Sequence, residues 1–160
     1  MSAITLDQAN RIIEAILKRA AEIDCRPLGV IVVEPGCKVK AFQKEDGCSM
    51  SRFEMAFGKA YAALALGRSS KLVRLRAEEK PIFMDYLIGV TGGQIFPEGG
   101  GRLIRDSGGG VIGAVGVTGD TEDCDEDLAA HGIRLAGLKT DEDCSDLGRR
   151  TNVRLSKYRV

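Results

Sequence analysis

Hydrophobic residues recur every three or four positions from Leu6 to Ile23, which predicts an amphipathic helix. Its repeating apolar positions are Ala9, Ile12, Ile13, Ile16, Ala20 and Ile23. Thr5 and Gln8 have the spacing of a capping box at the start of this helix. Pro27 ends the helical pattern, and the apolar, β-branched run from 28 to 33 predicts a central strand.

The next segments predict a hairpin followed by two helices. The sequence from Glu34 to Cys37 is typical of a tight turn, and the alternation around Val39 and Ala41 predicts a second strand. Ser51 and Glu54 form a second candidate capping box, at the head of a helix that runs to about residue 66. A shorter helix is predicted over 70–79, where Pro81 stops it.

Glycine interrupts the apolar segments in the last third of the chain. The stretches 91–97, 103–104 and 111–117 are separated by glycine runs, which predicts a three-stranded meander. Asp120 or Thr121 can cap a final helix that carries Leu128, Ile133 and Leu135. The predicted order is α-β-β-α-α-β-β-β-α. Because the hairpin and the meander need only short connections, we expect an α/β (α+β) fold with a central antiparallel sheet flanked by helices.

Length and charge narrow the class of protein. A chain of 160 residues fits one domain, which we place at 1–139, with a C-terminal extension over 140–160. The 23 basic and 23 acidic residues cancel, so we expect no nucleic-acid partner. The first ten residues lack the pattern of a secretory signal, and no segment has the length and hydropathy of a membrane span, so a cytoplasmic location is expected.

The potential metal ligands do not have the spacing of a known site. The five cysteines include no CxxC pair, which argues against a disulfide framework and against a zinc ribbon. The acidic run 121–127 lacks the pattern of an EF-hand, and the dipole of the predicted last helix accounts for acidic residues at its start. His131 would lie two turns after Cys124, where a structural role is favoured over ligation. We therefore predict no metal site.

Catalytic patterns are equally sparse. No phosphate-binding loop motif is present, and the run 108–110 precedes a strand, as in a hairpin turn. A single histidine disfavours a hydrolytic triad. The remaining candidates are Lys59, Tyr61 and Arg68, which are polar groups on or just after an apolar helix. A solvated lysine and a packed tyrosine would explain the same pattern.

Several short motifs follow one another in a fixed order along the chain. They are Gly29-Val30-Ile31-Val32-Val33-Glu34-Pro35-Gly36, Ala41-Phe42, Asp46-Gly47, Lys59-Ala60-Tyr61-Ala62-Ala63, Gly67-Arg68, Gly92-Gly93, Pro97-Glu98-Gly99-Gly100, Val111 to Gly119 and Asp125-Glu126. This ordered series resembles the GlcG/HbpS-like family, which includes haem-degrading domains and the C-terminal domain of a corrinoid adenosyltransferase. The resemblance covers about Leu6 to Leu138, and several motifs in order are more specific than any one alone.

The resemblance implies a profilin-like or roadblock-like domain that assembles into dimers and larger oligomers, up to octamers, and binds a small molecule. The polar points of the motifs place the site at Lys59, Tyr61 and Arg68 as tentative catalytic residues, with Arg68 clamping a carboxylate and Lys59 supplying charge or a proton. The ligand-binding residues would be Gly92, Gly93, Phe96 and Thr118.

Three functions remain open at this point. The first is a cytoplasmic, oligomeric small-molecule-binding protein, with an accessory enzymatic role in small-carboxylate or aromatic catabolism as its extension. The second is a haem- or tetrapyrrole-binding sensor or storage protein. Some haem-binding relatives use a histidine of the first helix, and 6–23 contains none, which weakens this alternative and leaves the cofactor unknown. The third is a non-catalytic assembly scaffold in which 140–160 clasps a second subunit.

Overall fold

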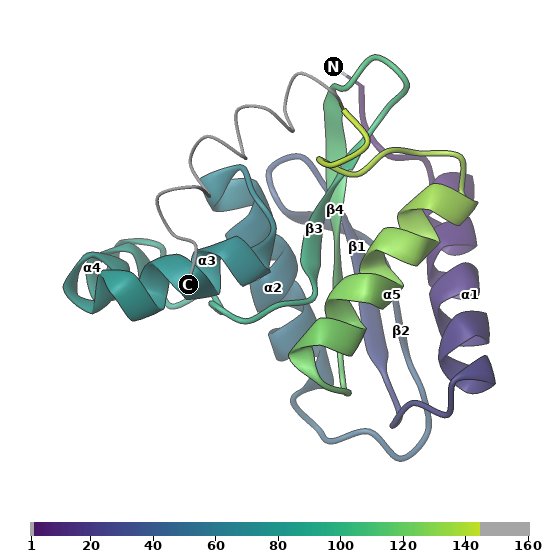
Figure 1. Ribbon diagram of the computed structural model, residues 1–160, viewed down its shortest axis with the longest axis horizontal. Coiled ribbons are helices and arrows are strands. Elements are labelled where there is room, and N and C mark those ends of the chain that lie inside the picture. The colour runs from purple at the N-terminus through teal and green to yellow at the C-terminus, as the bar shows by residue number, and fades with distance from the viewer. Residues whose placement is uncertain (1, 145–160) are drawn as a thin grey trace.

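The computed structural model describes residues 2–144, which form five helices and four strands around one sheet (Figure 1). Their order in the chain is α1 (Leu6–Glu22), β1 (Gly29–Glu34), β2 (Lys38–Lys44), α2 (Arg52–Leu66), α3 (Ser70–Glu79), α4 (Pro81–Val90), β3 (Gly101–Arg105), β4 (Val111–Thr118) and α5 (Glu122–Leu135). The predicted class, helices on both faces of a central antiparallel sheet, is confirmed.

The four strands pair in the order β2-β1-β4-β3, and every pair is antiparallel. The central strands β1 and β4 are buried on both faces, which explains their nearly continuous apolar sequences. Successive side chains of a strand point to opposite faces. Val30 and Val32 therefore join the core beneath α1 and α5, whereas Ile31 and Val33 join the core beneath α2.

Helix α2 lies unusually close to the sheet, and glycine makes this possible. A Cβ atom at Gly116 of β4 would overlap with the carbonyl oxygen of Ala56, and a Cβ atom at Gly101 of β3 would overlap with that of Lys59. Glycine in a strand often marks such an approach of another backbone. The small residues of α2 and of the strands thus hold Lys59 directly above the sheet.

One predicted strand is replaced by a helix, so the order is α-β-β-α-α-α-β-β-α. Pro81 ends α3 as expected, but it also occupies the first turn of α4, where proline lacks only an amide that would have no helical partner. The predicted strand over 91–97 forms a turn and a loop instead. The amide of Phe96 in this loop donates to the carbonyl of Gly58, which attaches the loop to α2 rather than to the sheet.

The predicted caps and termini have mixed outcomes. The Thr5–Gln8 capping box and the Thr121 cap of α5 are confirmed. The second capping box is wrong, because Ser51 makes no side-chain hydrogen bond to α2. Thr140 is buried, next to the bridge between Lys139 and Arg105 of β3, and most of the predicted extension over 140–160 lies outside the described residues. No helix within 2–144 is long and apolar enough to cross a membrane.

Candidate functional site

A buried ion pair joins α2 to α5 at one end of the sheet. The ammonium of Lys59 lies 3.0 Å from Oδ2 of Asp125 and donates to the carbonyl of Val117 at 2.9 Å. The side chains are 3% and 1% exposed. The other oxygen of Asp125 accepts from the amide of Asp120. A lysine on an alanine-rich, buried helix face is thus neutralised by the first turn of α5.

The environment of Asp125 acts on its pKa in opposite directions. Burial raises the pKa above the ordinary value of an aspartate, while Lys59 and the backbone amides oppose this rise by stabilising the charged form. The net direction is upward. Asp120 differs, because the amides of Arg26 and Thr121 donate to its carboxylate and lower its pKa.

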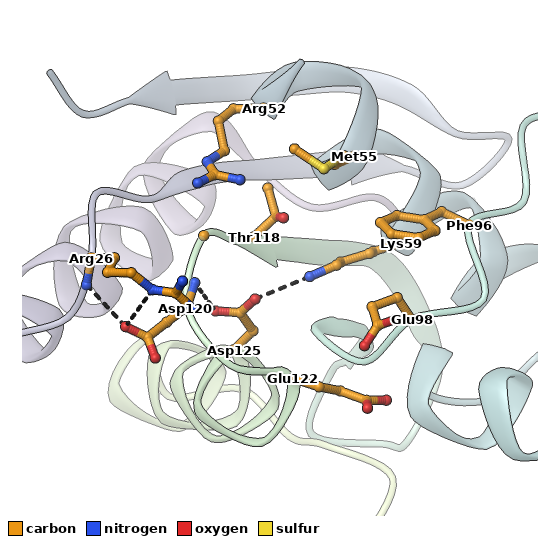
Figure 2. Close-up of a pocket in the computed structure, with 11 residues that line it drawn as sticks. Arg26, Arg52, Met55, Lys59, Phe96, Glu98, Thr118, Asp120, Glu122 and Asp125 are labelled. Carbon is orange, nitrogen blue, oxygen red and sulfur yellow. Dashed lines mark hydrogen bonds and ion pairs between the residues drawn. The ribbon is translucent and has the colours of Figure 1, made fainter. Parts of the chain in front are cut away.

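Beside this pair lies a pocket of about 270 Å³ between α2, the end of β4 and the start of α5 (Figure 2). Its walls combine charged side chains with the apolar surfaces of Met55 and Phe96. The lining residues are Arg26, Arg52, Met55, Lys59, Phe96, Glu98, Thr118, Gly119, Asp120, Glu122 and Asp125.

The acidic groups of the pocket have basic partners or hydrogen-bond donors within the protein. Asp125 pairs with Lys59, and both Glu98 and Glu122 pair with Arg74, which stands outside the pocket. Asp120 accepts from backbone amides and also lies 3.8 Å from the guanidinium of Arg26. These contacts leave the acidic wall largely neutralised.

Arg52 differs from the other charged residues of the pocket. Its Nε atom is buried and makes no hydrogen bond to any residue in the part of the chain that the structure describes. A buried donor without a partner costs free energy, typically about 1–3 kcal/mol. In Figure 2 the side chain of Arg52 extends from the start of α2, and its guanidinium group points toward the side of the pocket where Thr118 lies. This donor is suited to an anionic ligand.

The acidic start of α5 also holds the glycine loop that precedes β3. Glu122 accepts from the amide of Gly99, and Glu126 accepts from the amide of Gly100. Glu126 is 2% exposed, and burial raises its pKa despite the nearby guanidinium of Arg102. The Nε of Arg102 lies 2.9 Å from Oε2 of Glu126, but its hydrogen bond goes to the backbone carbonyl of Glu126. The Oε2 atom therefore lies beside a positive charge without accepting a well-directed hydrogen bond.

The structure brings three of the seven predicted site residues together in the pocket, namely Lys59, Phe96 and Thr118. The ammonium of Lys59 lies 5.9 Å from the centre of the Phe96 ring, within the range of a cation–π contact. The other four residues do not line this pocket. Their roles in ligand binding or catalysis stay predictions.

Each of these four residues has an identifiable structural setting. Tyr61 packs beside Phe57 on α2, with ring centres 6.1 Å apart. Arg68 follows the end of α2 and donates to the carbonyl of Leu66. Gly92 and Gly93 lie in the exposed turn after α4, where both have positive φ values that glycine adopts without strain.

Sequence reasoning missed the residues that give the pocket its charge. Arg52 has no distinguishing pattern of its own. Glu122 and Asp125 belong to the acidic run 121–127, for which the helix dipole is a sufficient explanation in the sequence, and Asp120 is predicted only as a candidate cap of the last helix. The useful signal was the pairing of that run with a lysine on an otherwise apolar helix face, since a buried charge needs a partner.

Comparison with known proteins agrees with this architecture. Residues 4–134 match the family model described as haem degrading protein HbpS-like. The chain belongs to the HbpS-like family. This confirms the family resemblance identified from the ordered motifs. The HbpS-like chain is also 30% identical, over 129 residues, to an uncharacterised 15.0 kDa protein in the dhaT-dhaS intergenic region of Citrobacter freundii, covering 81% of this chain and 89% of that protein.

Solved structures of other proteins have the same fold. The crystal structure of the Klebsiella pneumoniae protein ORFY, of the DUF336 family model, superposes with a TM-score of 0.77 at 27% identity, covering 86% of this chain and 92% of that one. A crystal structure of a PduOC complex with haem gives a TM-score of 0.75 at 20% identity, with 86% and 98% of the two chains covered. At that identity the second likeness concerns the fold alone.

Proposed function

We propose that this HbpS-like protein binds a small anionic metabolite, such as a carboxylate, in the pocket between α2 and α5. The observation that carries the proposal is the buried Nε donor of Arg52, which makes no hydrogen bond within the described residues. Charge-assisted hydrogen bonds from a guanidinium to a carboxylate are stronger than neutral ones and are often bidentate. A bound carboxylate would thus satisfy Arg52 and neutralise its charge.

The rest of the pocket suits a molecule of modest size. Its volume of about 270 Å³ lies just below the range of about 300–1,000 Å³ found for drug-sized ligands. Met55 and Phe96 supply apolar surface for a short aliphatic or aromatic body, and Thr118 supplies a hydroxyl. This combination of an apolar wall and few polar groups is typical of small-molecule sites.

Within this proposal Lys59 is a positioning residue. Its ammonium is committed to Asp125 and to the carbonyl of Val117, so it holds α5 and β4 in place beside the ligand. We therefore propose ligand binding, and not catalysis by Lys59, as the primary role of this site. The proposal extends to an accessory enzymatic role in small-carboxylate or aromatic catabolism, to assembly into dimers up to octamers and to a cytoplasmic location.

Thermal shifts with a panel of small aliphatic and aromatic carboxylates test the proposal. A ligand at 100 times its Kd stabilises the folded state by about 2.7 kcal/mol. At about 2–4 °C per kcal/mol, Tm should rise by about 5–11 °C. The corresponding neutral amides should give smaller shifts, because they lack the charge that Arg52 recognises.

A matched pair of variants links the shift to the pocket. Arg52→Met should abolish the shift, whereas Arg11→Met, the same change on the exposed face of α1, should preserve it. Absence of a shift across the panel, or an equal shift in Arg52→Met, would contradict the proposal.

Haem binding, the alternative raised by the sequence, fits this pocket poorly. Haem iron is usually held by histidine, cysteine, methionine or tyrosine. Met55 is the one residue of these types that lines the pocket, and the ammonium of Lys59 is already paired. His131 lies elsewhere on α5. Titration with haem separates the two functions: the carboxylate proposal predicts no saturable Soret shift, and a 1:1 shift that Met55→Leu abolishes would favour haem.

A further inference from the structure

Two cysteines far apart in the sequence meet beside the pocket. Cys25 lies in the link from α1 to β1 and Cys124 lies in the first turn of α5, yet their sulfur atoms are 3.4 Å apart. The carboxylate of Asp120 completes the group, and the three potential ligand atoms lie within 4.8 Å of one another. All three side chains are partly buried.

The distance between the sulfur atoms suits a shared metal ion. Two thiolates bound to Zn²⁺ at about 2.3 Å in tetrahedral geometry are about 3.8 Å apart. A disulfide requires about 2.05 Å. The observed 3.4 Å is therefore about 0.4 Å from the metal-bound spacing and more than 1 Å from the covalent one. The small adjustment favours coordination.

Backbone contacts preorganise the three donors. The amide of Arg26 donates to one oxygen of Asp120 at 2.9 Å, and the amide of Thr121 donates to the other at 2.7 Å. The amide of Cys124 donates to the hydroxyl of Thr121, which fixes the start of α5. Ligating carboxylates are commonly oriented by hydrogen bonds of this kind.

The types of donor atom suit a metal cation as well. A bound metal ion supplies positive charge, and a coordinated thiol is deprotonated. The group thus combines two soft sulfur donors with an oriented oxygen donor. Such a set favours Zn²⁺ over Mg²⁺ or Ca²⁺, which prefer oxygen.

We propose that Cys25, Cys124 and Asp120 bind one divalent, thiol-seeking cation of the zinc class. On binding, the two thiols lose two protons to solvent, the metal gains two sulfur ligands and one carboxylate oxygen, and no electron is transferred. Water fills the fourth position. Asp120 also lines the pocket, so the metal would stand at its edge. This site is independent of the anion contact at Arg52.

Titration of the metal-free, reduced protein with Co²⁺ tests the site, because thiolate ligation produces a charge-transfer band in the near ultraviolet. We expect saturation at one equivalent, release of about two protons per metal, and displacement by Zn²⁺ with loss of the band. A phosphine reductant keeps disulfide formation out of the measurement. Absence of the band, or failure of Zn²⁺ to displace it, would overturn the proposal.

Single substitutions assign the ligands. Cys25→Ser and Cys124→Ser should each weaken Co²⁺ affinity at least 100-fold, and Asp120→Asn at least 10-fold. Cys48→Ser, a matched change at a partly buried cysteine outside the group, should leave the affinity unchanged. Circular dichroism confirms that each variant is folded. A folded Cys25→Ser or Cys124→Ser protein with wild-type affinity would refute the site, whatever the outcome of the carboxylate titrations.

Discussion

The buried pair between Lys59 and Asp125 gives the strongest prediction about stability. With 3.0 Å between the charged atoms, the attraction is about 5–6 kcal/mol at an effective dielectric constant of about 20. Burial of both charges offsets much of this gross value. Replacing only the lysine, as in Lys59→Met, leaves Asp125 buried without its partner. That change should lower the free energy of unfolding by about 3–5 kcal/mol.

Urea denaturation and thermal unfolding measure this loss, which corresponds to a fall in Tm of about 6–20 °C. The double variant Lys59→Met/Asp125→Asn, which removes both charges, should be markedly more stable than the two single losses added together predict. Lys18→Met, on the exposed face of α1, should cost less than about 0.5 kcal/mol and controls for the loss of a lysine.

The stability defect of Lys59→Met should depend on pH. Burial already raises the pKa of Asp125, and removal of Lys59 should raise it further. The Lys59→Met defect should therefore shrink as the pH falls toward the ordinary aspartate value of 3.8, because protonation removes the unpaired charge of Asp125. A loss below 1 kcal/mol, or additive effects in the double variant, would refute the account of this pair.

Three further predictions concern packing, titration and reactivity. In urea denaturation, Gly116→Ala should destabilise the protein by about 3 kcal/mol, because the new Cβ atom overlaps with the Ala56 carbonyl. Gly89→Ala is the control, since a Cβ atom there meets open space. It should be neutral or stabilising by up to about 1 kcal/mol. Because burial raises the pKa of Glu126, its ionisation costs stability as the pH rises above 4.5, the ordinary pKa of a glutamate. The stability of Glu126→Gln relative to wild type should therefore increase as the pH rises above 4.5. A difference that stays constant with pH would refute this. The pKa of Cys124, raised to about 12 mainly by burial, should make its alkylation by iodoacetamide in the metal-free protein slower than that of a free cysteine, as peptide mass mapping can show.

Local patterns predicted most of the fold. Some elements leave a pattern within a short segment and are therefore visible in the sequence. Examples are the spacing of isoleucines in α1, the β-branched run of β1 and the cap at Thr121. The sequence does not predict helix α4, because Pro81 indicates the end of one helix and gives no separate sign that it also fits the first turn of the next. The loop after α4 was misassigned because its pairing with Gly58 depends on tertiary structure.

The site was less accessible to prediction because it depends on long-range contacts. The sequence indicates Lys59 as a polar residue on an apolar helix, but its partner Asp125 lies 66 residues away. Cys25 and Cys124 are separated by 99 residues and so have no motif spacing. Without such a spacing the sequence predicts no metal site, whereas the fold brings Cys25, Cys124 and Asp120 together.

The position of a bound carboxylate tests the central claim most directly. A crystal structure should be determined with the tightest-binding acid from the thermal-shift panel. The account predicts a carboxylate oxygen at hydrogen-bonding distance, about 2.7–3.2 Å, from the guanidinium group of Arg52, with the body of the ligand against Met55 and Phe96. A ligand bound elsewhere, or in this pocket without contact to Arg52, would contradict it.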